Sequence, residues 1–403
     1  MATPFPDSDR TASASAEAAA LLEELCAISS ASGDVDGLER MVARLARELE
    51  PYGFACEVER ETGGDGSDQP VLVARRPAGR GRPTLLIGHV DTVLPAAKPR
   101  RSDDRLVATG ALDMKGGFAA LLGALRLMTV SRCRIADGLL LLAVPDEEIG
   151  GPISERVVRR WGAEAGRVLV LEPGELRGED ETLVTGRRGM SVWRLEARGT
   201  ASHSGLAYWQ GRSAVAAAAH WCASAQGLSE PASGPIVNVG RIVGGDAEFV
   251  EGLGEQHGLL GTPRRLNIVA DRCLAEGEVR FLSSPDRDRC VRDLRELADA
   301  AASEAGVEVR FEVVEDIPPV DPYGPGRRLA ETLVETAARH GWTLHLEDDR
   351  GGVSFTNFLP DPSAMEVVDG LGPVGGGMHT RDEFLDLRSL RRRIALLATL
   401  LAE

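Results

Sequence analysis

The chain has 403 residues, and its 46 Lys and Arg against 62 Asp and Glu give a formal net charge of −16 at pH 7. This balance argues against nucleic-acid binding, because recognition of a phosphate backbone depends on clustered positive charge. At about 150 residues per domain the length allows two or three domains. Apolar residues make up 43% of the chain, which is enough for ordinary globular cores.

Three features of the sequence bear on the cellular location of the protein. Residues 1–25 lack the basic start and apolar block of a secretory signal. No apolar run approaches the roughly 18 residues that a membrane-spanning helix needs. The six cysteines are scattered and form no C-x-x-C pair, which is typical of buried reduced thiols. We therefore expect a cytoplasmic protein that does not enter a membrane.

The first part of the chain alternates helical and strand patterns. Residues 14–28 and 36–49 have apolar residues at the three- and four-residue spacing of amphipathic helices. Three short apolar runs are typical of buried parallel strands: 83–88, 139–144 and 168–171. A helix is predicted over 116–128, between the first two runs. This alternation indicates an α/β layer.

The pattern changes after Gly186. The following segments predict four strands, mostly of the alternating type with one solvated face, and two helices: strands 190–197, 236–242, 273–281 and 307–314, and helices 213–225 and 286–304. Helical and strand patterns like those of the first part of the chain return after Pro319, and the last of them is a predicted helix over 387–401. The simplest interpretation is a discontinuous α/β domain, 1–186 and 319–403, with residues 187–318 inserted as a smaller α+β lid domain.

Each of the three apolar strands leads directly into imidazole or carboxylate groups. The strand ends continue into the segments His89–Asp91, Pro145–Glu148 and Glu172–Pro173. Ligand sites of open α/β sheets lie at the carboxyl ends of their strands. Two more donors lie on Gly-rich segments, Asp113 just before a predicted helix and His379 near the C-terminus. We expect these groups to lie together.

Imidazole and carboxylate ligands without thiolates suit Zn²⁺, Mn²⁺ or Co²⁺. Two histidines and three carboxylates are too many for one catalytic zinc, which usually has three protein ligands. They suit two ions about 3.5–4 Å apart that share one carboxylate. One member of the Glu147–Glu148 pair would then be free to act as a base.

Taken singly, each of these groups has a simpler explanation. A His-x-Asp sequence is often a surface or helix-capping feature, and adjacent glutamates such as Glu147 and Glu148 are usually solvated. Asp113 could cap the helix that follows it. The combination at three strand ends favours a metal centre.

Six motifs carry a resemblance to a known family, and they occur in the order found there. They are GHVDTV (88–93), GALDMKGG (110–117), PDEEIGG (145–151), LEPGE (171–175), TASHSG (200–205) and GPVGGGMHTRDE (372–383). The sequence resembles the two-metal aminoacylase, glutamate carboxypeptidase and succinyl-diaminopimelate desuccinylase group of amidohydrolases. The resemblance implies a mixed-sheet catalytic domain sandwiched by helices, of the zinc-peptidase type, with an inserted lid and dimerisation domain.

The resemblance also implies a ligand set. His89 and Glu172 would hold one ion, Glu148 and His379 the other, and Asp113 would bridge them. The ions would be two Zn²⁺, with Co²⁺ or Mn²⁺ as alternatives.

Further roles follow from the same resemblance. Asp91 would fix the tautomer of His89. Glu147 would be the general base that deprotonates the bridging water. The Asp113–Met114 step would often be a cis peptide in this family.

Residues of the inserted domain are implied to complete the site. His203 would stabilise the tetrahedral oxyanion, commonly from the partner subunit of a lid-mediated homodimer. Asn267 and Arg280 would bind a substrate carboxylate, and Asn357 is a further candidate substrate contact. The simpler explanations are a loop histidine for His203 and a solvated strand position for Arg280.

Two departures from the family pattern lie in segments that, by the resemblance, would determine substrate specificity. Phe355 stands where relatives commonly have an acidic residue, in Gly351–Asn357. The stretch 246–265 before Asn267 is longer than expected.

The function implied is hydrolysis of an amide bond next to a free carboxylate, in a small peptide or an N-acyl amino acid. Glu172 supports this choice, because in the family a Glu there accompanies carboxypeptidases and deacylases, and an Asp accompanies aminopeptidases. The alternatives are an acetylornithine or succinyl-diaminopimelate deacylase and a dipeptidase. A different class of protein, a catalytically silent metal-binding assembly protein, would be expected to lack Glu147 or a ligand, and none is missing.

Overall fold

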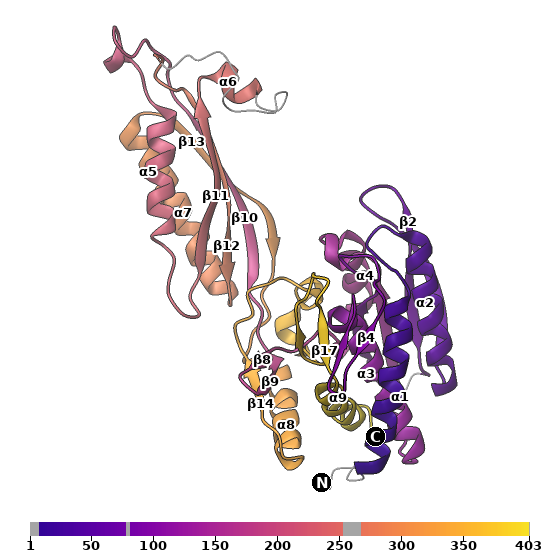
Figure 1. Ribbon diagram of the computed structural model, residues 1–403. Coiled ribbons are helices and arrows are strands. Elements are labelled where there is room, and N and C mark those ends of the chain that lie inside the picture. The colour runs from indigo at the N-terminus through magenta and orange to yellow at the C-terminus, as the bar shows by residue number, and fades with distance from the viewer. Residues whose placement is uncertain (1–7, 78–80, 253–266, 403) are drawn as a thin grey trace. The chain divides into compact units, whose positions relative to one another are not determined.

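The computed structural model describes residues 8–77, 81–252 and 267–402, which form two compact units (Figure 1). The larger unit contains the described residues up to Arg187 and from Asp321 onward, and the smaller contains those of Arg188–Val320. The chain therefore leaves the larger unit once and returns to it. The expected domain boundaries, after 186 and before 319, lie close to these positions.

A six-stranded mixed sheet forms the centre of the larger unit. Its order is β1 (Ala55–Thr62), β2 (Asp68–Arg75), β6 (Leu139–Val144), β3 (Thr84–His89), β7 (Arg167–Val170) and β15 (Glu366–Val368). β6, β3, β7 and β15 are parallel, whereas β1 and β2 form an antiparallel pair at one edge. The three predicted apolar strands are therefore neighbours, β6-β3-β7, as expected for an α/β layer.

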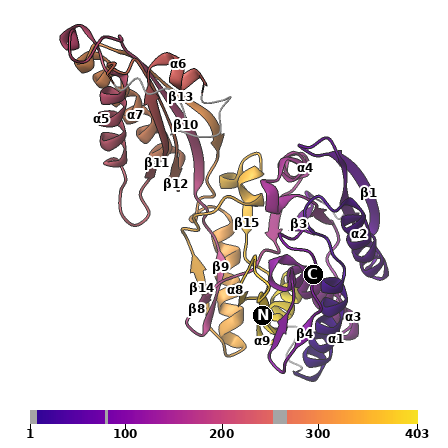
Figure 2. The ribbon, with the colours of Figure 1, turned by 45° about the horizontal axis from the view of Figure 1, so that its top comes forward.

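Helices flank this sheet (Figure 2). They are α1 (Ser8–Ala27), α2 (Val35–Leu49), α3 (Gly116–Val130), α4 (Pro152–Gly162), α8 (Gly326–Arg339) and α9 (Leu387–Leu400). α1, α3 and α9 pack against one another in one apolar core. α3 is buried on nearly all sides, because it also lies against β3, where Gly88 leaves room for the ring of Phe118. The predicted mixed α/β architecture is confirmed.

Two smaller sheets complete the larger unit. One has the order β14 (Leu344–Glu347), β9 (Asp180–Val184) and β8 (Leu176–Arg177). The other has the order β16 (Gly375–Gly376), β17 (Phe384–Asp386), β5 (Arg105–Val107) and β4 (Arg100–Arg101). β16 and β17 are antiparallel, and the loop between them carries His379.

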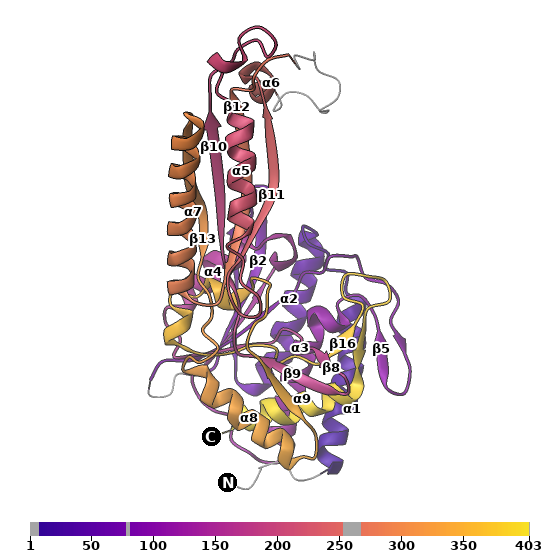
Figure 3. The same cartoon turned by 90° about the vertical axis from the view of Figure 1, so that its left-hand side faces the viewer.

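The smaller unit is an antiparallel sheet with two long helices (Figure 3). Its sheet has the order β11 (Ile236–Gly245), β12 (Arg272–Phe281), β10 (Gly189–Arg198) and β13 (Glu308–Ile317). α5 (Ala214–Gln226) and α7 (Ser284–Ala305) pack against each other and on this sheet, and α6 (Ala247–Gly252) is a short helix. Alternate residues of β10 are buried, because one face meets a core that includes Trp193 and Trp221.

The structure corrects one expected boundary and adds two strands. α1 begins at Ser8 rather than near residue 14, because Ser and Ala continue a helix without adding to its apolar pattern. No strands were predicted for β1 and β2. β1 is a charged edge strand, whereas β2 is buried but its purely apolar run is short, Val71–Ala74. Of the long stretch 246–265, residues 253–265 lie outside the described part of the chain.

Within the described residues, no helix is long and apolar enough to cross a membrane. All six cysteines are free thiols, and Cys26, Cys222, Cys273 and Cys290 are buried. The cytoplasmic location stays a prediction.

Candidate metal centre

The carboxyl ends of β6, β3 and β7 bring the predicted donors to one edge of the sheet. His89 is the last residue of β3, and Glu172 follows β7. Glu147 and Glu148 lie in a short 3₁₀ helix, Glu147–Ile149, just after β6. Because β6 and β7 both pair in parallel with β3, the residues that follow the three strands emerge side by side.

Two groups of donors have the spacing of metal ligands, and Asp113 belongs to both. In the first, His89 Nε2 is 3.0 Å from Asp113 Oδ1 and 3.6 Å from Glu172 Oε1. In the second, His379 Nε2 is 3.1 Å from Asp113 Oδ2 and 3.1 Å from Glu148 Oε2. The ligand atoms of each group lie within 4.8 Å of one another. One oxygen of Asp113 therefore faces each histidine, as a bridging carboxylate requires.

Asp91 connects His89 to the loop that carries the two glutamates. Its carboxylate accepts hydrogen bonds from the backbone N–H of Glu147 and of Glu148, both at 3.2 Å, and from the Ser32 hydroxyl at 2.8 Å. His89 Nδ1 is 3.3 Å from Asp91 Oδ1 and 3.0 Å from the Asp91 carbonyl oxygen. Both neighbours are acceptors, so Nδ1 carries the proton of a neutral His89 and Nε2 is left as the ligand atom.

Glu383 holds the turn that carries Asp113. Its buried carboxylate accepts hydrogen bonds from the backbone N–H groups of Gly110 at 2.9 Å, Leu112 at 2.8 Å and Asp113 at 3.0 Å. The Asp113–Met114 peptide is cis, as the resemblance implied. Sequence reasoning gave Glu383 no role. The signal available was its place at the end of the last family motif.

Asp146 was also missed. Its buried carboxylate accepts from the backbone N–H of Ile153 at 2.6 Å and of Ser154 at 2.9 Å, and from the Ser154 hydroxyl. These bonds fasten the first turn of α4 to the residue before Glu147. The loop with the two glutamates is thus fixed at both ends, by Asp91 and by Asp146.

Exchange of Glu383 for Gln is expected to weaken metal binding by roughly 10- to 100-fold, as loss of a partner that orients a ligand typically does. The amide would present an N–H₂ group to backbone donors that need acceptors. Metal affinity measured by competition with a chelating dye checks this. Asp382→Asn, at a neighbouring exposed side chain, is the matched control and should leave affinity unchanged. Equal affinities in the two variants would contradict the role of Glu383.

Negative charge is concentrated at the centre. Burial, followed by the repulsion of Asp113, raises the pKa of Glu148 to about 7. Burial also raises the pKa of Glu147, and it raises that of Glu172 well above its usual value. Hydrogen bonding to Asp113 raises the pKa of His379 to about 9. The protein alone can keep these carboxylates charged only against a large desolvation cost.

The residues present fit two divalent cations. Glu172 Oε1 is buried and has no hydrogen-bond partner among the described residues. Imidazole nitrogens and carboxylate oxygens, with no thiolate among them, are donors that Zn²⁺, Co²⁺ and Mn²⁺ accept. Positive charge between these groups would offset the burial and the repulsion that raise the pKa values of the glutamates.

Phe355 and Asn357 lie in a short 3₁₀ helix, Phe355–Phe358. The Phe355 ring is buried, with its centroid 6.2 Å from that of His89. The residue that departs from the family pattern therefore supplies an apolar neighbour to a ligand. Asn357 is buried, and its side-chain oxygen accepts from the Ser354 backbone N–H at 3.0 Å. Its substrate contact stays a prediction.

The remaining three candidates lie in the smaller unit. His203 is exposed, and its Nδ1 accepts from the backbone N–H of Gly205 at 3.1 Å and of Leu206 at 3.2 Å. These bonds place the proton of the neutral ring on Nε2, which lies 3.3 Å from Nδ2 of Asn267. Because that amide nitrogen is itself a donor, the Nε2–H does not donate to it. The ring is thus held as an N–H donor.

Arg280 lies on β12 and donates to Glu278 at 2.9 Å. Its Nη1 is buried without a hydrogen-bond partner among the described residues. The structure thus brings together His203 and Asn267, and leaves part of the Arg280 guanidinium for another acceptor. Their roles in catalysis stay predictions.

Comparison with known proteins identifies the family. The sequence model of the family described as Peptidase family M20/M25/M40 matches residues 85–403. The chain belongs to this family. Family membership and the donor groups around Asp113 make it a metallopeptidase-type hydrolase with a dinuclear metal site formed around His89, Asp113 and Glu172.

Individual members of the family match nearly the whole chain. Carboxypeptidase G2 of Pseudomonas sp. (strain RS-16) is 26% identical over 389 residues, which cover 95% of this chain and 88% of that protein. Succinyl-diaminopimelate desuccinylase of Herminiimonas arsenicoxydans is 25% identical, covering 92% and 94%. Among solved structures, aminopeptidase PepT of Bacillus cereus matches with a TM-score of 0.76 at 21% identity, covering 96% and 98%. This last likeness concerns the fold.

Proposed function

We propose that this family member hydrolyses an amide bond next to a free carboxylate, as a carboxypeptidase or an N-acyl-amino-acid amidohydrolase does. The observation that carries the proposal is the bridging position of Asp113 between two ligand groups, with Glu172 in the first of them. Two relatives that match over most of the chain, a carboxypeptidase and a desuccinylase, support this substrate class.

In this proposal His89, Asp113 and Glu172 hold one divalent cation, and Asp113, Glu148 and His379 hold the other. Zn²⁺ is the preferred ion, with Co²⁺ or Mn²⁺ as alternatives. When bound, two such ions polarise a carbonyl and lower the pKa of water. Asp91 keeps the Nε2 lone pair of His89 directed at its ion.

Glu147 acts as the general base. Its carboxylate is half-buried and makes no hydrogen bond within the described part of the chain, while its backbone is fixed by Asp91. It takes a proton from the attacking water as the C–O bond forms, and it returns the proton to the amine nitrogen as the C–N bond breaks. A base with a raised pKa is suited to both transfers.

The smaller unit serves in this proposal as a lid and dimerisation domain. His203, held as an Nε2–H donor, stabilises the oxyanion from the partner subunit. Arg280 and Asn267 bind the substrate carboxylate, and Asn357 is a further substrate contact. The enzyme would be a cytoplasmic homodimer.

The test is a screen of N-acyl amino acids and dipeptides with the purified protein, before and after chelation and with Zn²⁺, Co²⁺ or Mn²⁺ restored. We expect hydrolysis only with metal and only of substrates with a free carboxylate next to the cleaved bond. Cleavage of dipeptides alone would identify a dipeptidase, and cleavage of N-acetylornithine or N-succinyl-diaminopimelate alone would identify a deacylase of that type. Failure to cleave any of these by every metal-loaded form would contradict the proposal and favour a catalytically silent metal-binding protein.

Loss of Asp113 is expected to remove both ions. In Asp113→Ala, each ligand group loses its shared oxygen and retains one histidine and one glutamate. Elemental analysis after gel filtration should therefore find less than one ion per chain, whereas the wild type retains two. His379→Ala should retain the first ion, since only the second group contains this histidine. Two ions still bound to Asp113→Ala would refute the bridging assignment.

A further inference from the structure

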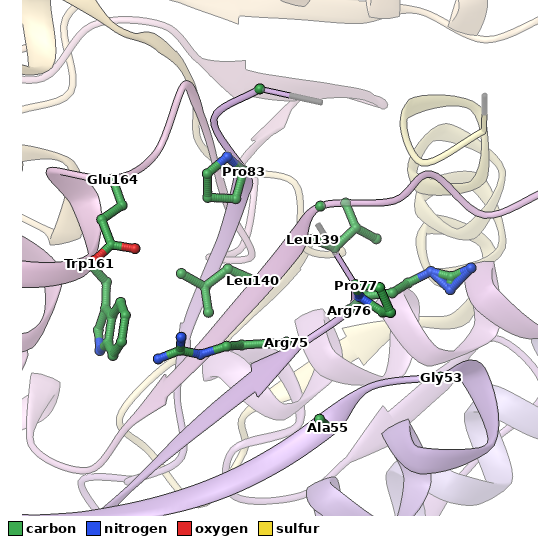
Figure 4. Close-up of a pocket in the computed structure, with 12 residues that line it drawn as sticks. Gly53, Ala55, Arg75, Arg76, Pro77, Pro83, Leu139, Leu140, Trp161 and Glu164 are labelled. Atoms are coloured by element: carbon green, nitrogen blue, oxygen red, sulfur yellow. The ribbon is translucent and has the colours of Figure 1, made fainter. Parts of the chain in front are cut away.

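A cavity lies in the larger unit, at the ends of β3 and β6 that are opposite to the metal centre (Figure 4). Its volume is about 460 Å³, within the range of small-molecule sites. Pro83 precedes β3 and Leu139 begins β6, whereas His89 and Val144 end these strands. Six-residue strands rising about 3.3 Å per residue separate the cavity from the metal centre by roughly 15–20 Å.

The wall of the cavity is mostly apolar. Ala55, Pro83, Leu140 and the indole of Trp161 contribute to it. Figure 4 shows Trp161 and Glu164 on one side and Leu140 and Pro83 on the other, with the Arg75 guanidinium reaching toward Trp161. Such a surface suits an apolar group of a ligand, because binding would remove the apolar area of both from water.

Two charged groups border this apolar surface. The Arg75 guanidinium stacks on Trp161, with its central carbon 4.2 Å from the ring centroid, and Glu164 lines the cavity with its carboxylate. Neither side chain has a hydrogen-bond or ion-pair partner in the part of the chain that the structure describes. Arg76, the other arginine of the lining, is engaged, because it donates to the carbonyl oxygens of Tyr52 and Ala136.

Stacking on the indole restricts the orientation of the Arg75 guanidinium and leaves its N–H edge for an acceptor. A guanidinium so held is suited to a carboxylate, which it can bind through two parallel hydrogen bonds. Glu164 would repel a simple anion but attract an ammonium group. The Arg75 cation, the Glu164 anion and the apolar wall are together complementary to a zwitterion with an apolar body.

We propose that this cavity binds a free α-amino acid with a large apolar side chain. Its carboxylate pairs with Arg75, its ammonium group pairs with Glu164, and its side chain lies against Leu140 and Pro83. Binding here does not depend on catalysis. If the proposed function also holds, the ligand belongs to the class of compound that cleavage next to a free carboxylate releases.

The test measures binding of L-phenylalanine to the metal-loaded enzyme by calorimetry and ligand-observed NMR. Three probes divide the ligand into its parts: 3-phenylpropionate lacks the ammonium group, phenethylamine lacks the carboxylate, and L-alanine lacks the apolar body. We expect L-phenylalanine to bind about two- to fivefold more tightly than each of them, since each lacks one contact and the ion pairs of exposed side chains such as Arg75 and Glu164 are weak.

Variants locate the site. Arg75→Gln and Glu164→Gln should each weaken L-phenylalanine binding about two- to fivefold, as loss of an exposed ion pair does. Both should leave peptide hydrolysis unchanged, because neither residue belongs to the metal centre. Arg40→Gln, at an exposed position of α2, is the matched control and should bind like the wild type. Thermal melting of each variant confirms that it is folded.

Several results would overturn the proposal. Absence of L-phenylalanine binding would do so, and so would equally tight binding of 3-phenylpropionate. Binding that survives both Arg75→Gln and Glu164→Gln would place the amino acid elsewhere, for example at the metal centre. Hydrolysis assays on the same preparations judge the proposed function separately, so the two proposals can fail independently.

Discussion

Glu147→Gln should lower kcat by roughly 10²- to 10⁴-fold while both ions remain bound, because the amide cannot accept the proton of the attacking water. The backbone N–H of residue 147 would still donate to Asp91, so the loop should keep its place. The measurement pairs steady-state kinetics on the best substrate of the screen with elemental analysis of the same sample.

Two comparisons make this result specific. Glu155→Gln changes an exposed glutamate of α4 that pairs with Arg159, and it should leave kcat unchanged. Glu148→Gln should lose metal as well as activity, since Glu148 lies 3.1 Å from His379 in the second ligand group. A metal-replete Glu147→Gln enzyme with undiminished turnover would exclude Glu147 as the base.

His203→Ala is expected to lower kcat by about 10²-fold or more without changing metal content, as removal of an oxyanion donor does. The affected group would be the Nε2–H, because Nδ1 already accepts from two backbone donors. His203→Gln, which retains an N–H donor on a flexible side chain, should recover part of the loss. The readout is kcat, with metal content measured in parallel.

Mixing two inactive proteins tests whether His203 acts across a dimer. A hybrid of His203→Ala and Glu147→Gln subunits would contain one site with both defects and one site with neither. Activity should therefore return as subunits exchange, which labelled subunits can follow. If exchange is complete and no activity returns, His203 does not act from the partner subunit.

The main strands and several helices could be predicted because their residues are buried on a regular period. Leu139–Val144 is uniformly apolar since both faces of β6 are covered, and β10 alternates since one face of its sheet meets a core. The β1–β2 pair could not be predicted in this way. β1 is a charged edge strand, and its place depends on pairing with β2 rather than on its own pattern.

The candidate site also has residues that the sequence could predict and residues that it could not. The donors His89, Glu148 and Glu172 could be proposed from the chain because strand ends in an α/β sheet converge, and the family motifs then suggested which residue had which role. The family motif that ends at Glu383 marked this residue, but it did not indicate that Glu383 would hold the Asp113 turn, because these residues are 270 positions apart. Such long-range hydrogen bonds exist only once the chain has folded.

The sequence by itself determined the chemistry available to this protein: two histidines and an excess of carboxylates on motifs in a fixed order, within an acidic chain. Only the tertiary structure decided how these groups meet. The parallel pairing of β6, β3 and β7 aligns the strand ends, and the β16–β17 loop brings His379 to Asp113 across 266 positions. The physical reason is that ligand geometry depends on distances of a few ångströms, which are set by packing between distant segments and not by neighbours along the chain.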